Sequence, residues 1–184
     1  MGFRMLPAVV AIATVALLSG CVPQEPVITP EPEPSSTPVF ASDEEALAAA
    51  TDAYAKYLEV YNAVAQDGGN SPDRLGSVVT SEWLQRESDS FEKFAQSGQR
   101  QVGDATFDNA QFQMRSSDEA GHEEVKIYVC WDLTGISFVD TSGHAVQSAN
   151  NPRVPLELLL ESGPTKPLPL LVAEIAPWSG TGVC

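Results

Sequence analysis

The sequence predicts an α+β domain in which N-terminal helices pack on a curved antiparallel sheet. Between residues 42 and 98, apolar side chains recur every three or four positions, which is helical spacing. From Gln101 onward, apolar and polar side chains alternate, which is strand spacing. Helices followed by strands along one chain favour an α+β arrangement over alternating βαβ units.

The first predicted helix begins at Ser42 and runs for about six turns. Ser42 suits the N-cap, and Glu45 is placed to reach back from the third helical position, which together form a capping box. A single apolar stripe follows, and the segment 67–70, with two glycines, ends the helix. The stripe consists of Leu47, Ala50, Tyr54, Tyr57, Leu58, Tyr61 and Val64.

A short helical piece is predicted over residues 72–79, and a second helix over residues 80–96. Gly98 marks the end of this helix. Its apolar positions predict a buried face made of Trp83, Leu84, Phe91 and Phe94.

Strands are predicted in the second half of the chain. The segment 101–116, with Phe107, Phe112 and Met114, predicts one strand or a strand pair. Residues 125–133 alternate most regularly, and residues 136–139 continue as strand into a hairpin loop at 140–143. A returning strand is expected at 146–148, and two more apolar runs occupy 154–161 and 168–175.

The N-terminal segment ends in Leu18-Ser19-Gly20-Cys21, which resembles the lipobox of bacterial lipoproteins. Arg4 precedes an apolar run over residues 8–18, which is too short for a permanent membrane span of about 20 residues. In lipoproteins the cysteine corresponding to Cys21 carries a diacylglyceryl group and becomes the first residue. The resemblance implies lipid anchoring at the extracytoplasmic face of the cell membrane. The alternative is an ordinary secretory signal in which Cys21 has no role.

Three segments are therefore expected: a signal peptide over residues 1–20, a lipidated cysteine with a Pro/Glu-rich linker over 21–41, and a folded domain over 42–184. Proline fixes φ and removes a hydrogen-bond donor, so a helix or sheet interior is not expected in the linker. As a polyproline-like spacer of about 3.1 Å per residue, it would reach up to about 60 Å. Its six prolines are Pro23, Pro26, Pro30, Pro32, Pro34 and Pro38.

The chain is strongly acidic, with a formal net charge of −15. Removal of residues 1–20 takes away only Arg4, which leaves 9 basic and 25 acidic residues and a net charge of −16. Phosphate binding requires Lys and Arg, so neither nucleic acid nor anionic lipid headgroups are expected as direct partners. The charge favours solubility of an exported domain.

The chain contains three cysteines. If Cys21 is acylated, Cys130 and Cys184 remain, and an exported chain favours a disulfide between them. The segment 180–182, Gly-Thr-Gly, would give the terminus the freedom to reach its partner. The alternative is a buried Cys130 and a free terminal thiol.

At the level of the fold, the chain resembles the cystatin/NTF2-like cone, and more narrowly small lipoproteins of high-GC Gram-positive bacteria. The lipobox, the linker, Ala53-Tyr54 with Tyr57, the segment 129–132 (Val-Cys-Trp-Asp) and Cys184 carry the resemblance. The resemblance implies a cone whose cavity is lined by Tyr54, Tyr57, Tyr61, Trp83 and Trp131.

Some NTF2-like relatives isomerise steroids or cyclise polyketides, with a deep carboxylate base and a tyrosine or protonated acid that stabilises an oxyanion. The residues that could form such a site are Tyr54, Tyr57, Tyr61, Tyr128, Asp104 and Asp132. Tyrosines at helical spacing, however, usually belong to a core. No catalytic residue is assigned. His122 and His144 fall in predicted loops without further ligands at metal-binding spacing, so no metal or other cofactor is expected.

The favoured function is a non-enzymatic, membrane-anchored module that binds an envelope protein or a small ligand. The alternative is a tethered NTF2-like enzyme or small-molecule carrier that uses the cone. A large apolar pocket with convergent polar groups would favour the alternative, and a cone filled by its own side chains would favour the module.

Anchoring can be tested by Cys21→Ala. We expect this variant to lose all incorporation of labelled fatty acid, because the thiol of Cys21 is the expected acylation site, and to remain uncleaved or be released. Metabolic labelling followed by electrophoresis measures both effects. Normal acyl labelling of the variant would contradict the lipoprotein interpretation.

Overall fold

The chain divides into two units, Met1–Glu33 and Pro34–Cys184. The computed structural model describes residues 39–146, 152–163 and 170–184, all of which belong to the second unit. The predicted signal peptide, Cys21 and the linker up to residue 38 lie outside the described residues. Within the described ranges, no helix is both long and apolar enough to cross a membrane.

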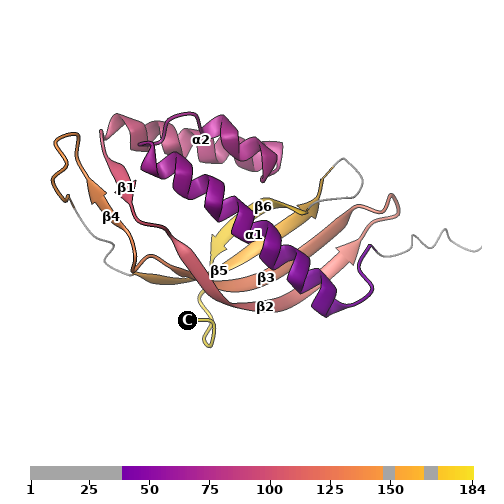
Figure 1. Ribbon diagram of the computed structural model, residues 1–184. Coiled ribbons are helices and arrows are strands. Elements are labelled where there is room, and N and C mark those ends of the chain that lie inside the picture. The colour runs from indigo at the N-terminus through magenta and orange to yellow at the C-terminus, as the bar shows by residue number, and fades with distance from the viewer. Residues whose placement is uncertain (1–38, 147–151, 164–169) are drawn as a thin grey trace, which may run out of the picture. The chain divides into compact units, whose positions relative to one another are not determined.

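The described domain is α+β, as predicted, and its helices precede a curved antiparallel sheet (Figure 1). The helical elements are α1 (Asp43–Gln66), the short 3-10 helix η1 (Pro72–Ser77) and α2 (Ser81–Gln96). The main sheet has the order β2-β3-β5-β6, formed by β2 (Thr106–Ser117), β3 (Glu123–Asp132), β5 (Arg153–Ser162) and β6 (Leu170–Pro177). A smaller sheet pairs β1 (Arg100–Val102) with β4 (Ser137–Val139).

The N-terminus of α1 is capped as the sequence predicts, with one difference. The Ser42 hydroxyl accepts a hydrogen bond from the backbone N–H of Glu45 at 3.2 Å. The Glu45 carboxylate, however, accepts from the backbone N–H of Ala41 at 2.7 Å, one residue beyond the N-cap. At the other end, Gly68 and Gly69 take φ values of +72° and +84°, which glycine adopts without steric strain.

The core lies between α1 and the inner face of the main sheet. Val125, Ile127 and Val129 of β3 are fully buried, as the alternating pattern predicts, and Leu158 and Leu160 of β5 are fully buried beside them. Burial of each such side chain contributes about 1.5–3 kcal/mol. The α1 side of this core is formed by Ala46, Ala50, Ala53, Tyr54, Tyr57, Leu58, Val64 and Ala65.

Helix α2 is placed by the segment that precedes it. The backbone N–H of Thr80 donates to the Val172 carbonyl at 2.9 Å, and the Val172 N–H donates to the Val78 carbonyl at 3.0 Å. This short parallel contact covers part of the free edge of β6 and sets the start of α2 beside it. Phe91 is buried as predicted, while the other residues expected on that face, Trp83, Leu84 and Phe94, are half-buried.

The described residues begin at Val39, next to the turn that joins β2 to β3. The backbone N–H of Val39 donates to the buried carboxylate of Glu123 at 2.9 Å. Arg115 of β2 donates to the Phe40 carbonyl at 2.8 Å and forms an ion pair with Asp43 at 2.9 Å. These contacts fix the residues that lead into α1 to the first residue of β3 and to its neighbour β2.

Two predicted strand segments are paired differently from expectation. The segment 101–116 forms two strands, β1 and β2, as one of the two predicted alternatives, but they pair with β4 and β3 and not with each other. The chain breaks between them at Gly103, which takes φ +81° and lies so close to the Gly135 carbonyl that no Cβ would fit. The buried Asn62 side chain holds the backbone between this break and β2. It donates to the Ala105 carbonyl at 2.9 Å and accepts from the Ala105 N–H at 3.0 Å.

The segment 136–139 forms β4, which pairs with β1 instead of continuing along β3. Of the expected returning strand at 146–148, Val146 donates its N–H to the Phe138 carbonyl, and residues 147 and 148 lie outside the described residues. Strands β5 and β6 confirm the last two apolar runs, except that residues 168 and 169 are outside the described ranges.

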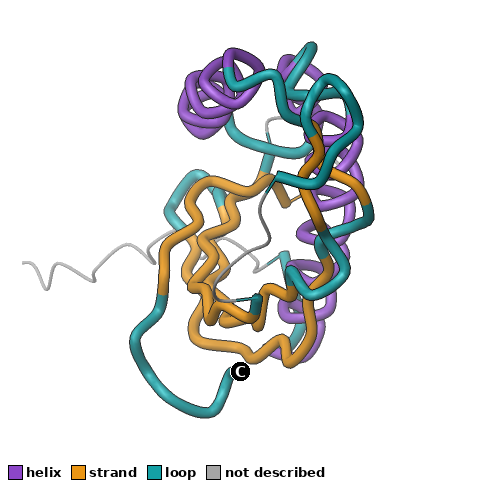
Figure 2. The backbone as a smooth tube through the Cα atoms, turned by 90° about the vertical axis from the view of Figure 1, so that its left-hand side faces the viewer, coloured by secondary structure: helices purple, strands orange, loops and turns teal. Residues whose placement is uncertain are grey.

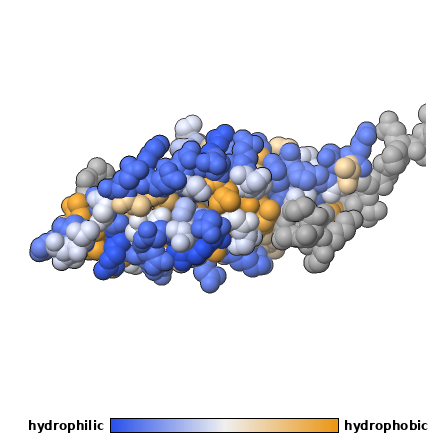
Figure 3. All heavy atoms as spheres, turned by 90° about the horizontal axis from the view of Figure 1, so that it is seen from above, coloured by the Kyte–Doolittle hydropathy of each residue, from blue (hydrophilic) through white to orange (hydrophobic). Residues whose placement is uncertain are grey.

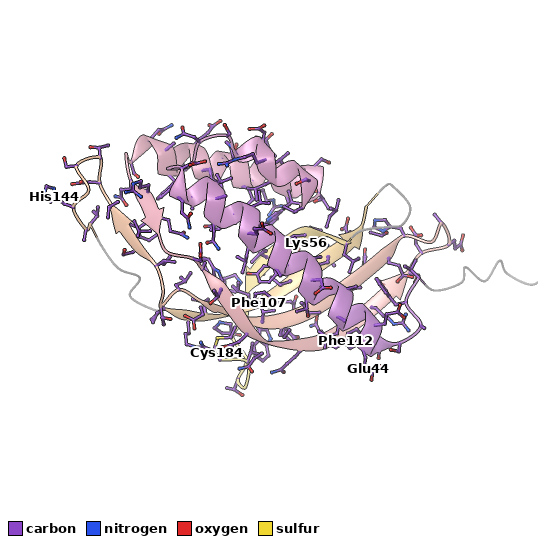
Figure 4. The ribbon with its side chains drawn as sticks, viewed as in Figure 1. Glu44, Lys56, Phe107, Phe112, His144 and Cys184 are labelled. Atoms are coloured by element: carbon purple, nitrogen blue, oxygen red, sulfur yellow. A yellow bond between two sulfur atoms is a disulfide. The ribbon has the colours of Figure 1, made fainter. Side chains whose placement is uncertain are left out.

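The C-terminal tail folds over the outer face of the main sheet, on the side away from α1 (Figures 1 and 2). Cys130 of β3 and Cys184 are joined by a disulfide with a Cα–Cα distance of 5.1 Å, and Cys184 lies beneath the sheet in Figure 4. Trp178 packs on Tyr128 with ring centroids 4.5 Å apart. Gln111 donates to the Gly182 carbonyl at 3.0 Å, so the tail is held by β2 as well.

Seen from above, the helical side of the domain is largely hydrophilic, and apolar atoms gather in a band between hydrophilic rows (Figure 3). Glu59 of α1 and Glu82 and Glu92 of α2 are exposed. This surface agrees with the acidic composition of the chain.

The disulfide predicts a large loss of stability in Cys184→Ser. The bridge links residues 54 positions apart, and a loop of this length stabilises the folded state by about 4 kcal/mol in the chain-entropy model. We expect a loss of this order in the free energy of unfolding, measured by urea denaturation without reductant. Addition of reductant should destabilise the wild type and leave the variant unchanged. Equal stability of the two oxidised proteins would contradict the prediction.

Candidate functional site

A pocket of about 270 Å³ lies between α1, α2 and the inner face of the main sheet. It contains all five residues that the sequence places around a cavity, and it adds one acidic residue and four apolar ones. We call it the aromatic pocket. It is lined by Tyr54, Tyr57, Leu58, Tyr61, Trp83, Glu87, Trp131, Leu156, Ile175 and Pro177.

Helical spacing explains how α1 and α2 supply the lining. Tyr54, Tyr57 and Tyr61 are separated by three and four positions, so they lie on one face of α1. Trp83 and Glu87 are four positions apart, which places them together on one face of α2. Trp131, near the end of β3, lies close to α1, because its ring centroid is 6.4 Å from that of Tyr61.

The aromatic rings of the pocket are set at different angles. Tyr54 and Tyr57 are nearly parallel, with centroids 5.6 Å apart and an interplanar angle of 17°. Tyr61 is tilted by 42° from Tyr57, at 5.7 Å, and Trp131 is turned by 82° from Tyr61. The rings therefore meet the pocket in several orientations and do not form one flat wall.

The lining changes from buried to exposed across the pocket. Tyr54, Tyr57 and Leu156 are buried, Trp83 and Ile175 are half-buried, and Pro177 is exposed. A ligand would therefore reach the pocket from the side on which Pro177 lies.

Glu87 is the charged residue of the pocket. Its side chain is 8% exposed, and its Oε1 accepts hydrogen bonds from the Tyr57 hydroxyl at 2.6 Å and from the Trp83 indole N–H at 3.0 Å. No hydrogen bond from a described residue reaches Oε2, and no described Lys, Arg or His forms an ion pair with Glu87. This carboxyl group is thus oriented by two donors and has no cationic partner in the described part of the chain.

Burial sets the protonation behaviour of the pocket. Burial raises the pKa of Glu87, and the hydrogen bonds from Tyr57 and Trp83 partly oppose that rise. Burial and the nearby Glu87 carboxylate raise the pKa of Tyr61 to about 12 and that of Tyr57 well above its ordinary value. The tyrosines therefore stay neutral hydrogen-bond donors at physiological pH.

The other candidate residues lie away from the pocket. Asp104 accepts a hydrogen bond from Gln66 at 2.7 Å beside a separate hollow between α1 and β2. Asp132 is bound by Thr134 and Arg153, and these partners lower its pKa, with Thr134 contributing most. Tyr128 packs on Trp178 at the outer face of the sheet.

The two histidines also lie away from the pocket. His122 lies 3.9 Å from Glu161, and His144 lies 3.8 Å from Asp140 in the loop after β4, at the end of the domain away from Glu44 (Figure 4). Among the described residues, no group of three or more His, Cys, Asp or Glu side chains is arranged to hold a metal ion.

Glu87 is the residue that sequence reasoning missed. It lies four positions after Trp83 and four before Phe91, so it interrupts the predicted buried face of α2 with an acid. An acidic residue in line with an apolar helical stripe indicates either a partner inside the protein or a binding role. This spacing is the signal by which it could have been found.

The raised pKa of Glu87 predicts a pH-dependent effect of Glu87→Gln. The amide oxygen still accepts from Tyr57 and Trp83, but the variant cannot titrate. Because the pKa in the folded state is above the usual 4.5, the folded state binds this proton more tightly than the unfolded state. The resulting stabilisation is fully present below about pH 4.5 and is lost as the pH rises through the folded-state pKa.

We therefore expect the free energy of unfolding of the wild type, minus that of the variant, to fall as the pH rises above about 4.5. Urea denaturation between about pH 4 and about pH 8 measures it. Glu92→Gln is the matched control, since it removes an exposed acid from the same helix. If the difference in free energy of unfolding between the wild type and Glu87→Gln did not change with pH, the raised pKa of Glu87 would be contradicted.

Comparison with known proteins gives a likeness at the level of the fold. No protein-family model matches the sequence, and no curated protein matches it. Among solved structures, the crystal structure of the intermembrane space region of the chloroplast protein ARC6 aligns with a TM-score of 0.53. The alignment has 12% sequence identity and covers 73% of this chain and 97% of that chain. This chain therefore has a fold similar to that region of ARC6.

Proposed function

We propose that this protein is a membrane-tethered lipoprotein of the cell envelope whose folded domain binds a small molecule in the aromatic pocket. The observation that carries the proposal is the pocket itself, with its aromatic walls and its buried Glu87. The lipobox resemblance at Leu18–Cys21 supports the tether and an extracytoplasmic location. The Pro/Glu-rich linker supports a domain held away from the membrane surface.

The lining of the pocket suits a small, largely apolar ligand. Ligand sites are mostly apolar and carry a few polar groups that fix orientation. Here Leu58, Leu156 and Ile175 supply apolar walls, while Glu87 and Tyr57 supply polar groups at one place. At about 270 Å³ the pocket is slightly smaller than the usual range for ligand sites, about 300–1,000 Å³, so the ligand is expected to be small.

The exposed surface offers less support for a protein partner. The exposed large hydrophobic residues of the described chain are Val39, Val102, Met114 and Val146. They belong to four separate parts of the chain, and single exposed apolar residues of this kind are normal for a folded surface. A small ligand is therefore the better supported of the two partner classes.

A second candidate function is a proton-transfer enzyme, and Glu87 is the observation that favours it. A carboxyl group whose pKa is raised by burial has a property of general acids and bases. Binding is proposed first because Tyr57 and Trp83 both donate to Glu87 Oε1, so an oxyanion donor would have to come from Tyr54 or Tyr61 instead.

The pocket can be tested with the neutral fluorescent probe N-phenyl-1-naphthylamine and the variant Ile175→Trp. Ile175 is a half-buried lining residue, so a larger side chain would occupy the space that a ligand needs. We expect the wild type to bind the probe, with a rise in its emission, and the variant to bind about tenfold more weakly or less. Fluorescence titration of the full-length protein measures both.

Val102→Trp is the control, because it adds the same indole at an exposed position of β1 outside the pocket lining. It should bind the probe as the wild type does, and circular dichroism should show that both variants are folded. Equal loss of probe binding in both variants would overturn the pocket as the binding site, and a wild type that binds neither this neutral probe nor a charged one would overturn the proposal.

A further inference from the structure

The environment of Glu87 lacks the counter-charge that a buried carboxylate requires. Buried charges in proteins are normally paired or neutralised, because transfer of an unpaired carboxylate from water is costly. Glu87 is more than nine-tenths buried, and within the described ranges no Lys, Arg or His forms an ion pair with it. Its Oε1 is satisfied by two donors, while Oε2 is left without a described partner.

We propose that the aromatic pocket binds a small organic cation, an alkylammonium or quaternary ammonium group, with Glu87 as its counter-ion. The ligand would place its positive charge beside the carboxylate and its alkyl groups against the aromatic and aliphatic walls. This inference rests on the proposed small-ligand function and names the ligand class of the same pocket.

The aromatic lining provides the second half of the recognition. The electron-rich faces of Trp and Tyr rings attract cations, and several such rings around one space are the usual way in which proteins hold quaternary ammonium groups. Here three tyrosines and two tryptophans line one pocket, with rings at several angles. One of these rings already has a cation over it, since the Arg86 guanidinium carbon lies 5.6 Å from the centroid of Trp83.

The chemistry of the pocket disfavours other charged ligands. A hard metal cation needs six or more oxygen ligands, and the ring and aliphatic walls offer few beyond one carboxylate and the tyrosine hydroxyls. An anion would be repelled by Glu87 and by the net charge of −15 of the chain. The same net charge attracts cations and would raise their local concentration near the domain.

Choline and 3,3-dimethylbutan-1-ol form a matched pair of probes, because the second replaces the quaternary nitrogen of the first by carbon. They have nearly the same shape and differ in charge. We expect the full-length protein, in choline-free phosphatidylglycerol nanodiscs, to bind choline at least about tenfold more tightly than the alcohol. Isothermal titration calorimetry measures both affinities.

Glu87→Gln should weaken choline binding by about tenfold or more and change binding of the neutral alcohol by less than about twofold. Glu92→Gln removes the same charge from the exposed face of α2 and should leave both affinities unchanged. This control separates a local contact with Glu87 from a general effect of net charge.

The outcomes are distinguishable. Equal binding of the two probes, or equal weakening of choline binding by both glutamine variants, would overturn the cation assignment while the small-ligand function stands. Failure of the protein to bind either of these probes or N-phenyl-1-naphthylamine would overturn the small-ligand function and this inference together.

Discussion

The contact between α1 and the inner face of the main sheet is the interaction on which the rest of the domain depends. The N-terminal half of α1 presents Ala46, Ala50 and Ala53 to the core, and small side chains allow close packing. Further along, it presents Tyr54, Tyr57 and Tyr61 instead, whose rings line the aromatic pocket. The same helix therefore closes the core at one end and borders the aromatic pocket further along. Asn62, one residue after the last tyrosine, forms two hydrogen bonds with the backbone of Ala105, directly before β2. Helix α1 therefore also positions β2, the edge strand of the main sheet.

Glu87 shows how a local cost to folding can indicate a function. An apolar residue at this position of α2 would complete the buried face between Trp83 and Phe91 without any penalty for desolvating a carboxyl group. The domain instead holds an acid there and orients it with the Tyr57 hydroxyl and the Trp83 indole. Polar groups that are buried, oriented and only partly satisfied are expected where a ligand completes the set. The aromatic pocket has this character.

Much of the fold could be predicted from the sequence, because local signals set it. The change from helical to strand spacing near Gln101 is visible along the chain, and so are the cap at Ser42 and the alternation in β3. The parity of the cysteines predicted the Cys130–Cys184 bridge, and helical spacing predicted the tyrosine face.

Most features that the sequence did not predict depend on contacts between distant parts of the chain. β1 and β4 have three residues each, and their pairing depends on the close approach of Gly103 to Gly135. Cys130 occupies an outward position and is buried because a tail 54 positions later covers it. Glu87 is different, because its signal is local: it lies four positions from both Trp83 and Phe91, but the spacing of the apolar residues alone does not reveal an acid on that face. The lipobox and the NTF2-like resemblance stay predictions.

The anchoring of Val39 to Glu123 has a geometric consequence for the pocket. Glu123 is the first residue of β3, and Trp131, which lines the pocket, is eight positions further along the same strand. At about 3.3 Å per residue, the two are separated by about 26 Å. The chain thus enters the domain at one end of a stiff strand, and the aromatic pocket lies toward the other. A label or fusion partner joined at Val39 would thus attach at the opposite end of β3 from Trp131.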